Sequence, residues 1–99
     1  ENATVTTEPM RVLTLDDLVQ FSLRPDSLSW EQLRVFDYEE AGSGLYIRIY
    51  NTEGPFQLMV GGIDPESEPM YFRLYALDGS EAFLDIRDGG VESFWKKHS

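Results

Sequence analysis

The sequence predicts an α+β domain: two N-terminal helices, a four-stranded antiparallel meander and a C-terminal helix, with the helices on one face of the sheet. Three observations support this prediction. Helix-start signals occur twice in the first third of the chain, apolar residues alternate with a period of two between residues 45 and 87, and a helical pattern returns near the C-terminus. A chain of 99 residues can close one core, so we expect residues 13–99 to form a single domain after a flexible tether at residues 1–12.

Two short segments have the start signals of helices, LTLDDL from Leu13 and LSWEQL from Leu28. Thr14 and Ser29 can cap the first free backbone amides, and the flanking leucines have the spacing of hydrophobic staples. The first helix is expected to end near Arg24, because a proline follows it. The second helix is brief and carries three apolar residues: Trp30, Leu33 and Phe36.

Residues 42–62 hold two alternating segments between glycine clusters, and we expect a β-hairpin with the turn NTEGP. The alternative is a glycine-rich ligand loop. That loop would need its glycines between a strand and the start of a helix, and these glycines lack that context. The hairpin buries six apolar side chains in the pairs Ile49 with Phe56, Ile47 with Leu58 and Leu45 with Val60.

The segments MYFRLYAL and AFLDIR are expected to be the third and fourth strands. The Asp78-Gly79 dipeptide favours a two-residue turn, whereas the alternation favours a three-residue loop that also includes Ser80. We follow the alternation, because burial of several apolar side chains outweighs one favoured turn type. The resulting core pairs are Leu74 with Leu84 and Phe72 with Ile86, and a last helix follows from Asp88 or Gly90 with Val91, Phe94 and Trp95 on one side.

Charge and composition argue against several functions. Eighteen acidic and eight basic residues give a net charge of −10, which disfavours binding to nucleic acid or anionic lipid. No apolar run approaches the roughly 20 residues of a membrane helix. The chain has no cysteine, and its single histidine, His98, lies next to the C-terminus, where a Ser-His-acid site is not expected. We therefore expect no catalytic residues, no metal site and no cofactor. Asp64, Glu66 and Glu68 could converge on calcium, but a solvated acidic loop suits them better.

Opposite the predicted core face, the strands are rich in tyrosine and arginine. Such a surface is typical of protein interfaces, because both side chains bury much area and arginine can clamp a carboxylate. The alternative is a solvated sheet face on which the arginines pair with Asp85 or stack on the rings. The whole face comprises Tyr46, Arg48, Tyr50, Gln57, Met59, Tyr71, Arg73, Tyr75, Phe83, Asp85 and Arg87. The predicted contact residues within it are Tyr46, Arg48, Tyr50, Tyr71, Arg73 and Arg87.

Six segments between residues 13 and 94, taken in order, resemble the C-terminal extracytoplasmic part of bacterial membrane-bound zinc metallopeptidase and antirepressor proteins of the beta-lactam-sensor type. They are LTLDDL, LSWEQL, GSGLYIRIY, LMVGG, EPMYFRLY and LDIRDGGVESF. Similar segments occur in small secreted or lipid-anchored bacterial proteins. No HExxH motif is present, so no catalytic residue carries over. The resemblance implies a non-catalytic domain outside the membrane, with residues 1–12 as a tether from a lipid anchor or a last membrane span.

The sequence therefore predicts an extracytoplasmic sensor or interaction domain that binds a protein or peptide through the Tyr/Arg face. One alternative is a small acidic inhibitor or immunity-type protein that mimics the charge of a substrate. An inhibitor would lose affinity steeply as the salt concentration rises, because it would bind through acidic residues. These residues would be Glu39, Glu40, Asp64, Glu66 and Glu68. Another alternative is an oligomerisation module that pairs through a sheet edge or face.

Overall fold

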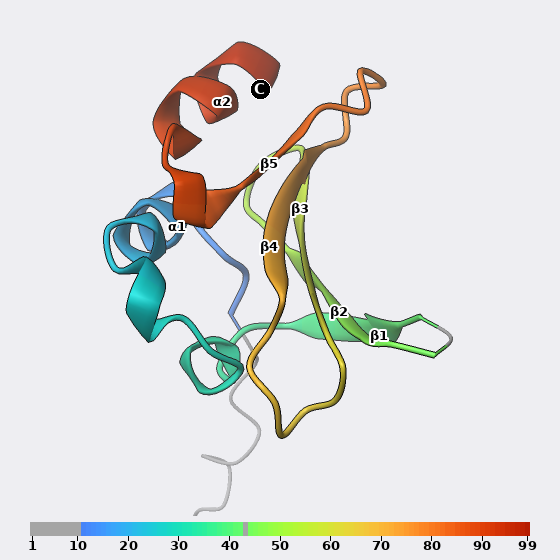
Figure 1. Cartoon of the computed structure of the whole chain (residues 1–99). Helices are drawn as coiled ribbons and strands as arrows, with labels where there is room; N and C mark the ends of the chain where they lie inside the picture. Colours follow the sequence, from blue (N-terminus) through green and yellow to red (C-terminus); the bar gives the residue numbers. More distant parts are fainter. Residues whose placement is uncertain (1–10, 43) are drawn as a thin grey trace, which may run out of the picture.

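The computed structural model describes residues 11–42 and 44–99. In this part of the chain the elements follow in the order α1 (Leu15–Ser22), η2 (Pro25–Ser27), η3 (Glu31–Leu33), β1 (Tyr38–Ala41), β2 (Tyr46–Asn51), β3 (Phe56–Gly62), β4 (Tyr71–Ala76), β5 (Phe83–Asp85), η4 (Ile86–Asp88) and α2 (Val91–His98), where η marks a short 3-10 helix. The helices lie on one face of the sheet (Figure 1). The α+β class and the antiparallel meander are confirmed, but the sheet has five strands in the order β1-β2-β3-β4-β5 rather than four.

Helix α1 begins where the sequence predicts. The Thr14 hydroxyl accepts a hydrogen bond from the Asp17 backbone amide (3.1 Å), and the Asp17 carboxylate accepts one from the Thr14 amide (3.0 Å). This reciprocal pair is a complete capping box. Leu13 and Leu18, the expected hydrophobic staple, are both fully buried. The helix ends at Ser22, ahead of the proline that was expected to stop it.

The second predicted helix is shorter than expected. It is reduced to η3, whose cap residue Trp30 makes no side-chain capping hydrogen bond. Phe36 is 3% exposed. Because its side chain is buried in the core, the chain leaves the helical conformation before this residue. The next residue, Asp37, donates from its backbone amide to the carbonyl of Arg11 (2.7 Å). Tertiary contacts thus end a helix that local capping signals favour.

Two residues of the predicted tether, Arg11 and Val12, lie within the described part of the chain. Arg11 pairs in parallel with Phe36, and its backbone amide donates to the Val35 carbonyl (3.1 Å). The rest of the predicted tether, residues 1–10, lies outside the described residues, so the tether stays a prediction.

The additional strand is β1, which forms an edge of the meander. It pairs with β2 so that Glu39 lies opposite Ile49. Its sequence, YEEA, lacks the apolar alternation that marks a half-buried strand. In the structure three of its four residues are exposed. Gly42 leaves β1 with a φ of +104°, which glycine adopts without steric cost. The glycines at positions 42 and 44 therefore lie in a connection between two strands.

Strands β2 and β3 form the predicted hairpin, but the predicted register is wrong. Ile49 pairs with Met59 instead of Phe56, a shift of three positions along β3. An odd shift exchanges the two faces of a strand. Tyr50 is therefore fully buried. The expected core residues of this segment turn away from the core or are exposed: Leu45, Ile47 and Ile49.

Contacts from the N-terminal segment explain the shift. The Leu13 amide donates to the Asn51 carbonyl (3.0 Å), and the Glu53 amide donates to the Leu13 carbonyl (2.8 Å). These bonds hold β2 extended through Asn51. The Thr52 hydroxyl then donates to the Phe56 carbonyl (2.7 Å) and closes the connection to β3. A segment remote in sequence thus decides where the turn begins.

Strands β4 and β5 pair as the alternation predicts, with Leu74 opposite Leu84. Ile86, the expected partner of Phe72, is fully buried although it lies in η4 rather than in β5. From β3 onward the predicted core residues are confirmed as buried, namely Phe56, Leu58, Val60, Phe72, Leu74 and Ile86. Leu84 is partly buried against them.

Helix α2 follows Gly90, as predicted, and covers one end of the sheet. The ring of Phe56 stacks on Trp95 with 4.4 Å between centroids and lies 5.7 Å from Phe94. Val91, in the first turn, is 2% exposed. No helix within the described residues is long and apolar enough to cross a membrane.

Candidate functional site

The predicted Tyr/Arg contact face does not exist as one surface, because the shifted register of β2 divides its members between the two sides of the sheet. The open side of the sheet holds Tyr71 and Arg73. Arg87 lies beyond β5, in η4. The side that the helices cover holds the other three: Tyr46, Arg48 and Tyr50.

Arg48 packs among aromatic side chains on the helix-covered side of the sheet. Its guanidinium donates to the hydroxyls of Tyr46 (2.6 Å) and Tyr50 (3.2 Å), and it lies 4.3 Å from the ring centroid of Tyr38 and 5.1 Å from that of Trp30. Burial works against the charge, but the two tyrosine hydroxyls hold the pKa of Arg48 above its usual value. Burial in turn raises the pKa of Tyr50, so this residue is neutral. Arg48 thus stacks on aromatic rings, as the alternative in the sequence analysis expects, but it does so on the side that the helices cover and not on a solvated face.

Arg87 also has a structural role. It donates to the Asp85 carboxylate (2.7 Å) and to the Met70 carbonyl (2.8 Å). Asp85 accepts in addition from the backbone amide of Phe72 (3.2 Å), which replaces a ladder bond where β5 ends. Burial acts to raise the pKa of Asp85, but the hydrogen bonds from Arg87 and the backbone lower it overall. The bonds from the Phe72 amide to Asp85 and from Arg87 to the Met70 carbonyl therefore hold β5 and η4 against the start of β4.

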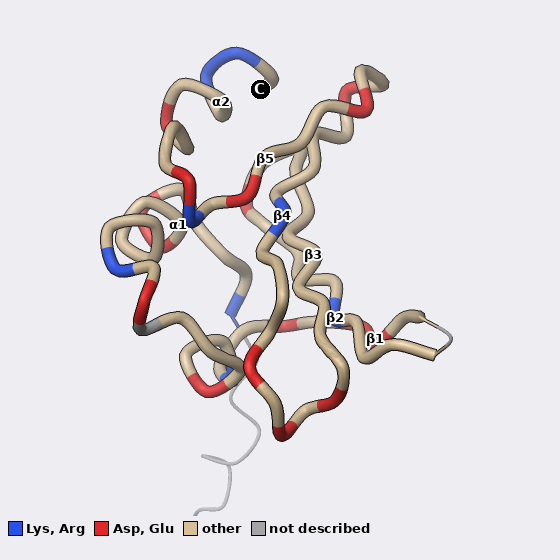
Figure 2. The backbone as a smooth tube through the Cα atoms, viewed as in Figure 1, with Lys and Arg blue, Asp and Glu red and all other residues tan. Residues whose placement is uncertain are grey.

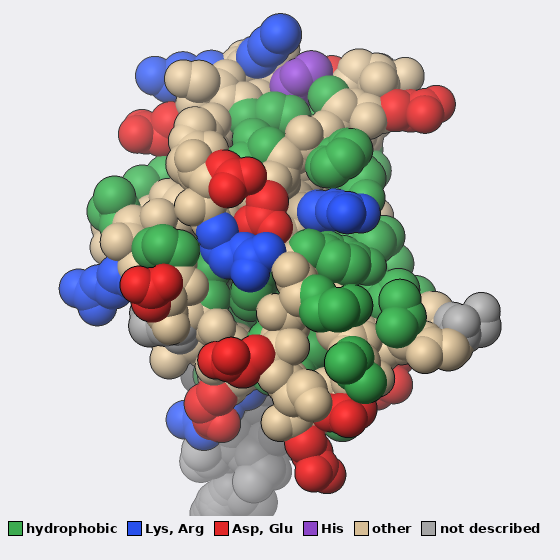
Figure 3. Space-filling view, viewed as in Figure 1, with side chains coloured by type: hydrophobic (Ala, Val, Ile, Leu, Met, Phe, Trp, Pro, Cys, Tyr) green, Lys and Arg blue, Asp and Glu red, His purple; other side chains and the backbone are tan. Residues whose placement is uncertain are grey.

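The side of the sheet away from the helices is the stronger candidate for a site. We call it the open face. Figure 3 shows hydrophobic side chains gathered there over β3 to β5, with a basic side chain among them. Phe83 is 50% exposed and packs on Tyr75 with 5.1 Å between ring centroids. The open face consists of Ile47, Ile49, Gln57, Met59, Tyr71, Arg73, Tyr75 and Phe83.

Arg73 lies between two aromatic rings of the open face. Its guanidinium is 4.3 Å from the ring centroid of Tyr71 and 5.4 Å from that of Phe83. The Tyr71 ring is held across Gly61, where a Cβ atom would come within 2.3 Å of it. Asp85 is the cross-strand neighbour of Arg73 but is bonded to Arg87. Within residues 11–42 and 44–99, Arg73 forms no ion pair.

A hollow of about 440 Å³ lies beside Arg73 on the open face. Met59 and Phe83 contribute to its wall, and Leu77, which is 54% exposed, stands at its border. Sequence reasoning missed Ile49 as part of this site because the expected register placed it in the core. The lining residues are Ile49, Gln57, Met59, Tyr75, Ala76, Leu77, Glu81 and Phe83.

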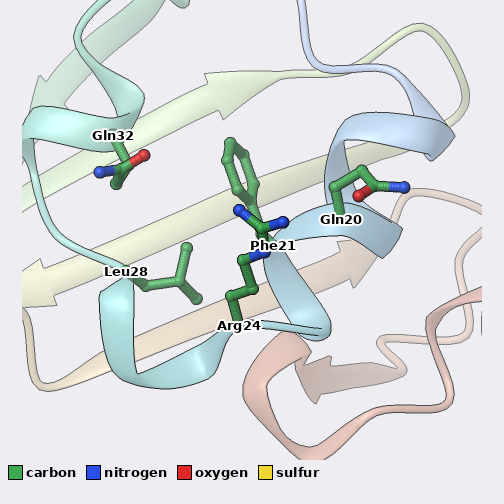
Figure 4. Close-up of a pocket in the computed structure, with 5 residues that line it drawn as sticks. All are labelled: Gln20, Phe21, Arg24, Leu28 and Gln32. Carbon is green, nitrogen blue, oxygen red and sulfur yellow. The ribbon is translucent and has the colours of Figure 1, made fainter.

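A second hollow, of about 310 Å³, lies between α1 and the 3-10 helices η2 and η3. Figure 4 shows its five lining side chains. Gln20 and Gln32 lie on opposite sides, and their amide groups do not converge on a common point. The hollow thus lacks a set of polar groups arranged around one ligand atom. Its lining is Gln20, Phe21, Arg24, Leu28 and Gln32.

His98 lies close to Asp78 and Ser80, but the arrangement is not that of a Ser-His-Asp triad. The Nδ1 atom of His98 is 2.8 Å from an Asp78 oxygen and 3.5 Å from the Ser80 hydroxyl. In a triad the acid and the serine contact opposite ring nitrogens. The Ser80 hydroxyl instead donates to Asp78. The three residues join α2 to the β4–β5 connection.

The acidic residues between β3 and β4 form a loop at the bottom of the view in Figure 2. Asp64 accepts hydrogen bonds from the backbone amides of Glu66 (2.9 Å) and Ser67 (2.7 Å). The Ser67 side chain, together with these two amides, holds the pKa of Asp64 below its usual value. Trp30 donates from Nε1 to the Ser67 carbonyl (2.7 Å) and anchors the loop. No cluster of three or more potential metal ligands occurs in the part of the chain that the structure describes.

The fold and its open face define an α+β meander domain with one sheet face uncovered. Comparison with models of protein families, with curated proteins and with solved structures finds no match. The resemblance of residues 13–94 to the extracytoplasmic part of metallopeptidase and antirepressor proteins therefore remains a prediction.

Proposed function

We propose that this domain is a non-catalytic binding module whose contact surface is the open face and whose partner is a protein or peptide. The observation that carries the proposal is the uncovered set of aromatic and aliphatic side chains around a hollow of about 440 Å³. Contiguous apolar patches on soluble domains mark interaction sites. The residue types on this face, tyrosine, phenylalanine, methionine and arginine, are those enriched in protein interfaces.

This surface replaces the predicted one only in part. Tyr71 and Arg73 are retained from the sequence prediction, and Ile49 joins them. A location outside the membrane and a role as a sensor stay predictions that rest on the sequence resemblance. The acidic-inhibitor alternative receives less support, because Asp64 is bonded within its own loop.

Small organic probes can locate the binding surface without a known partner. Phenol and 2-methylpropanol are titrated into the ¹⁵N-labelled protein, and amide chemical shifts are followed. We expect saturable shifts in β3 to β5. Phe83→Ser should weaken probe binding yet change the free energy of unfolding by less than about 1 kcal/mol, because Phe83 is half exposed. Leu23→Ser is the matched control, since Leu23 is 68% exposed and lies outside the open face.

Two results would contradict this proposal. The probes could bind in the hollow between α1 and η3 instead of on the open face. Alternatively, Phe83→Ser could bind the probes as tightly as Leu23→Ser does.

A further inference from the structure

We infer that the partner segment presents a carboxylate beside a large apolar side chain, with the carboxylate on Arg73 and the apolar group in the adjacent hollow. This inference rests on the proposed function and specifies its ligand chemistry. It is drawn from the surroundings of Arg73, from the position of the hollow, and from the charge of the whole chain.

Within the described residues Arg73 forms no ion pair. Its guanidinium carbon lies 4.3 Å from the ring centroid of Tyr71 and 5.4 Å from that of Phe83. A guanidinium that stacks on aromatic rings can still bind a carboxylate in its own plane, through two parallel hydrogen bonds. Asp85 is the nearest acidic residue across the strand pair. Its two oxygens accept hydrogen bonds from Arg87 and from the Phe72 amide, so Asp85 is already engaged.

The hollow lies next to Arg73. Met59 pairs with Arg73 across β3 and β4, Phe83 stacks on the guanidinium, and both residues line the hollow. Its volume of about 440 Å³ falls within the range of ligand pockets, about 300–1,000 Å³. One short segment can therefore place a carboxylate on Arg73 and an aromatic or aliphatic group in the hollow.

Charge distinguishes this occupant from a second copy of the chain. Two copies that pair face to face about a two-fold axis bring their Arg73 side chains toward each other, because β4 runs through the middle of the open face. They also bring together two chains of net charge −10. The same net charge disfavours a partner that is acidic overall. We therefore assign the face to a neutral or basic partner with a single carboxylate beside its apolar group.

N-acetylphenylalanine and its amide form a matched pair of probes that differ only in the carboxylate. Each is titrated at pH 7 into ¹⁵N-labelled wild type, Arg73→Gln and the control Arg34→Gln, whose exposed arginine pairs with Glu31 on η3. We expect wild type and the control to bind the acid roughly fivefold more tightly than the amide. Arg73→Gln should bind both probes equally. Amide shifts in β3 to β5 report the site.

The outcomes separate this inference from the proposed function. Equal affinity of wild type for acid and amide on the open face overturns the carboxylate site and leaves the binding module intact. If neither probe shifts the β3 to β5 amides, both proposals fail. A third outcome is that wild type sediments as a dimer and Phe83→Ser as a monomer. The open face would then bind a second copy of the chain, and the inference would be wrong.

Discussion

The register of β2 is tested by truncating two neighbouring side chains, Tyr50 and Ile49, to alanine. Tyr50 is fully buried, packs 5.4 Å from the ring centroid of Tyr38 and accepts a hydrogen bond from Arg48. Removal of a large buried ring costs about 3–5 kcal/mol, and loss of the acceptor adds about 1 kcal/mol. Ile49 is only partly buried on the open face, and its truncation should cost about 1 kcal/mol. The two free energies of unfolding should therefore differ by at least about 2 kcal/mol.

Urea unfolding followed by far-UV circular dichroism at pH 7 measures this difference. Tyr50→Phe is added because Tyr50→Ala removes a large share of the stability of a small domain, about 5–15 kcal/mol in total. The phenylalanine variant keeps the ring and should lose only about 1 kcal/mol. If Ile49→Ala proves more destabilising than Tyr50→Ala, then Ile49 faces the core and the register described above is wrong.

Two further predictions concern contacts made by α2. Gly54→Ala places a Cβ atom 2.6 Å from the Trp95 ring and should lower the free energy of unfolding by about 1–3 kcal/mol in urea titrations; an unchanged value would show that α2 is not packed there. Hydrogen bonds from Ser80 and His98 hold the pKa of Asp78 below its usual value. The Asp78 carboxylate therefore contributes fully to the free energy of unfolding above about pH 4, and this contribution is lost as the pH falls further. Asp78→Asn should flatten the acid limb of the stability curve between pH 5 and pH 2, measured by thermal unfolding at each pH, and an identical limb would refute this role.

The sequence predicted those elements whose signals are local. The capping box of Thr14 and Asp17 forms as expected, because both partners lie within one turn of the helix. The β4–β5 pairing follows from alternation, since only one face of each strand is strongly apolar. Strand β1 was not predicted because YEEA has no apolar alternation: two of its four residues are glutamates, and only pairing with β2 makes it a strand.

The candidate site could be predicted only in part. Tyr71 and Arg73 were placed on the correct side of their strand, because Phe72 and Leu74 between them are clearly apolar. Strand β2 carries large side chains on both faces, so its alternation fits either orientation. The hydrogen bonds between Leu13 and the end of β2 select the one observed.

The sequence by itself determined the class of the fold, the positions of four strands and the acidic character of the chain, because these depend on local pattern and on composition. Only the tertiary structure decided which face of β2 enters the core and which arginines are paired. Arg48 donates a hydrogen bond to the Tyr46 hydroxyl, and Arg87 pairs with Asp85. Arg73 is half-buried beside the rings of Tyr71 and Phe83 and forms no ion pair within the described residues. The physical reason is that burial and pairing depend on neighbours that are distant in sequence.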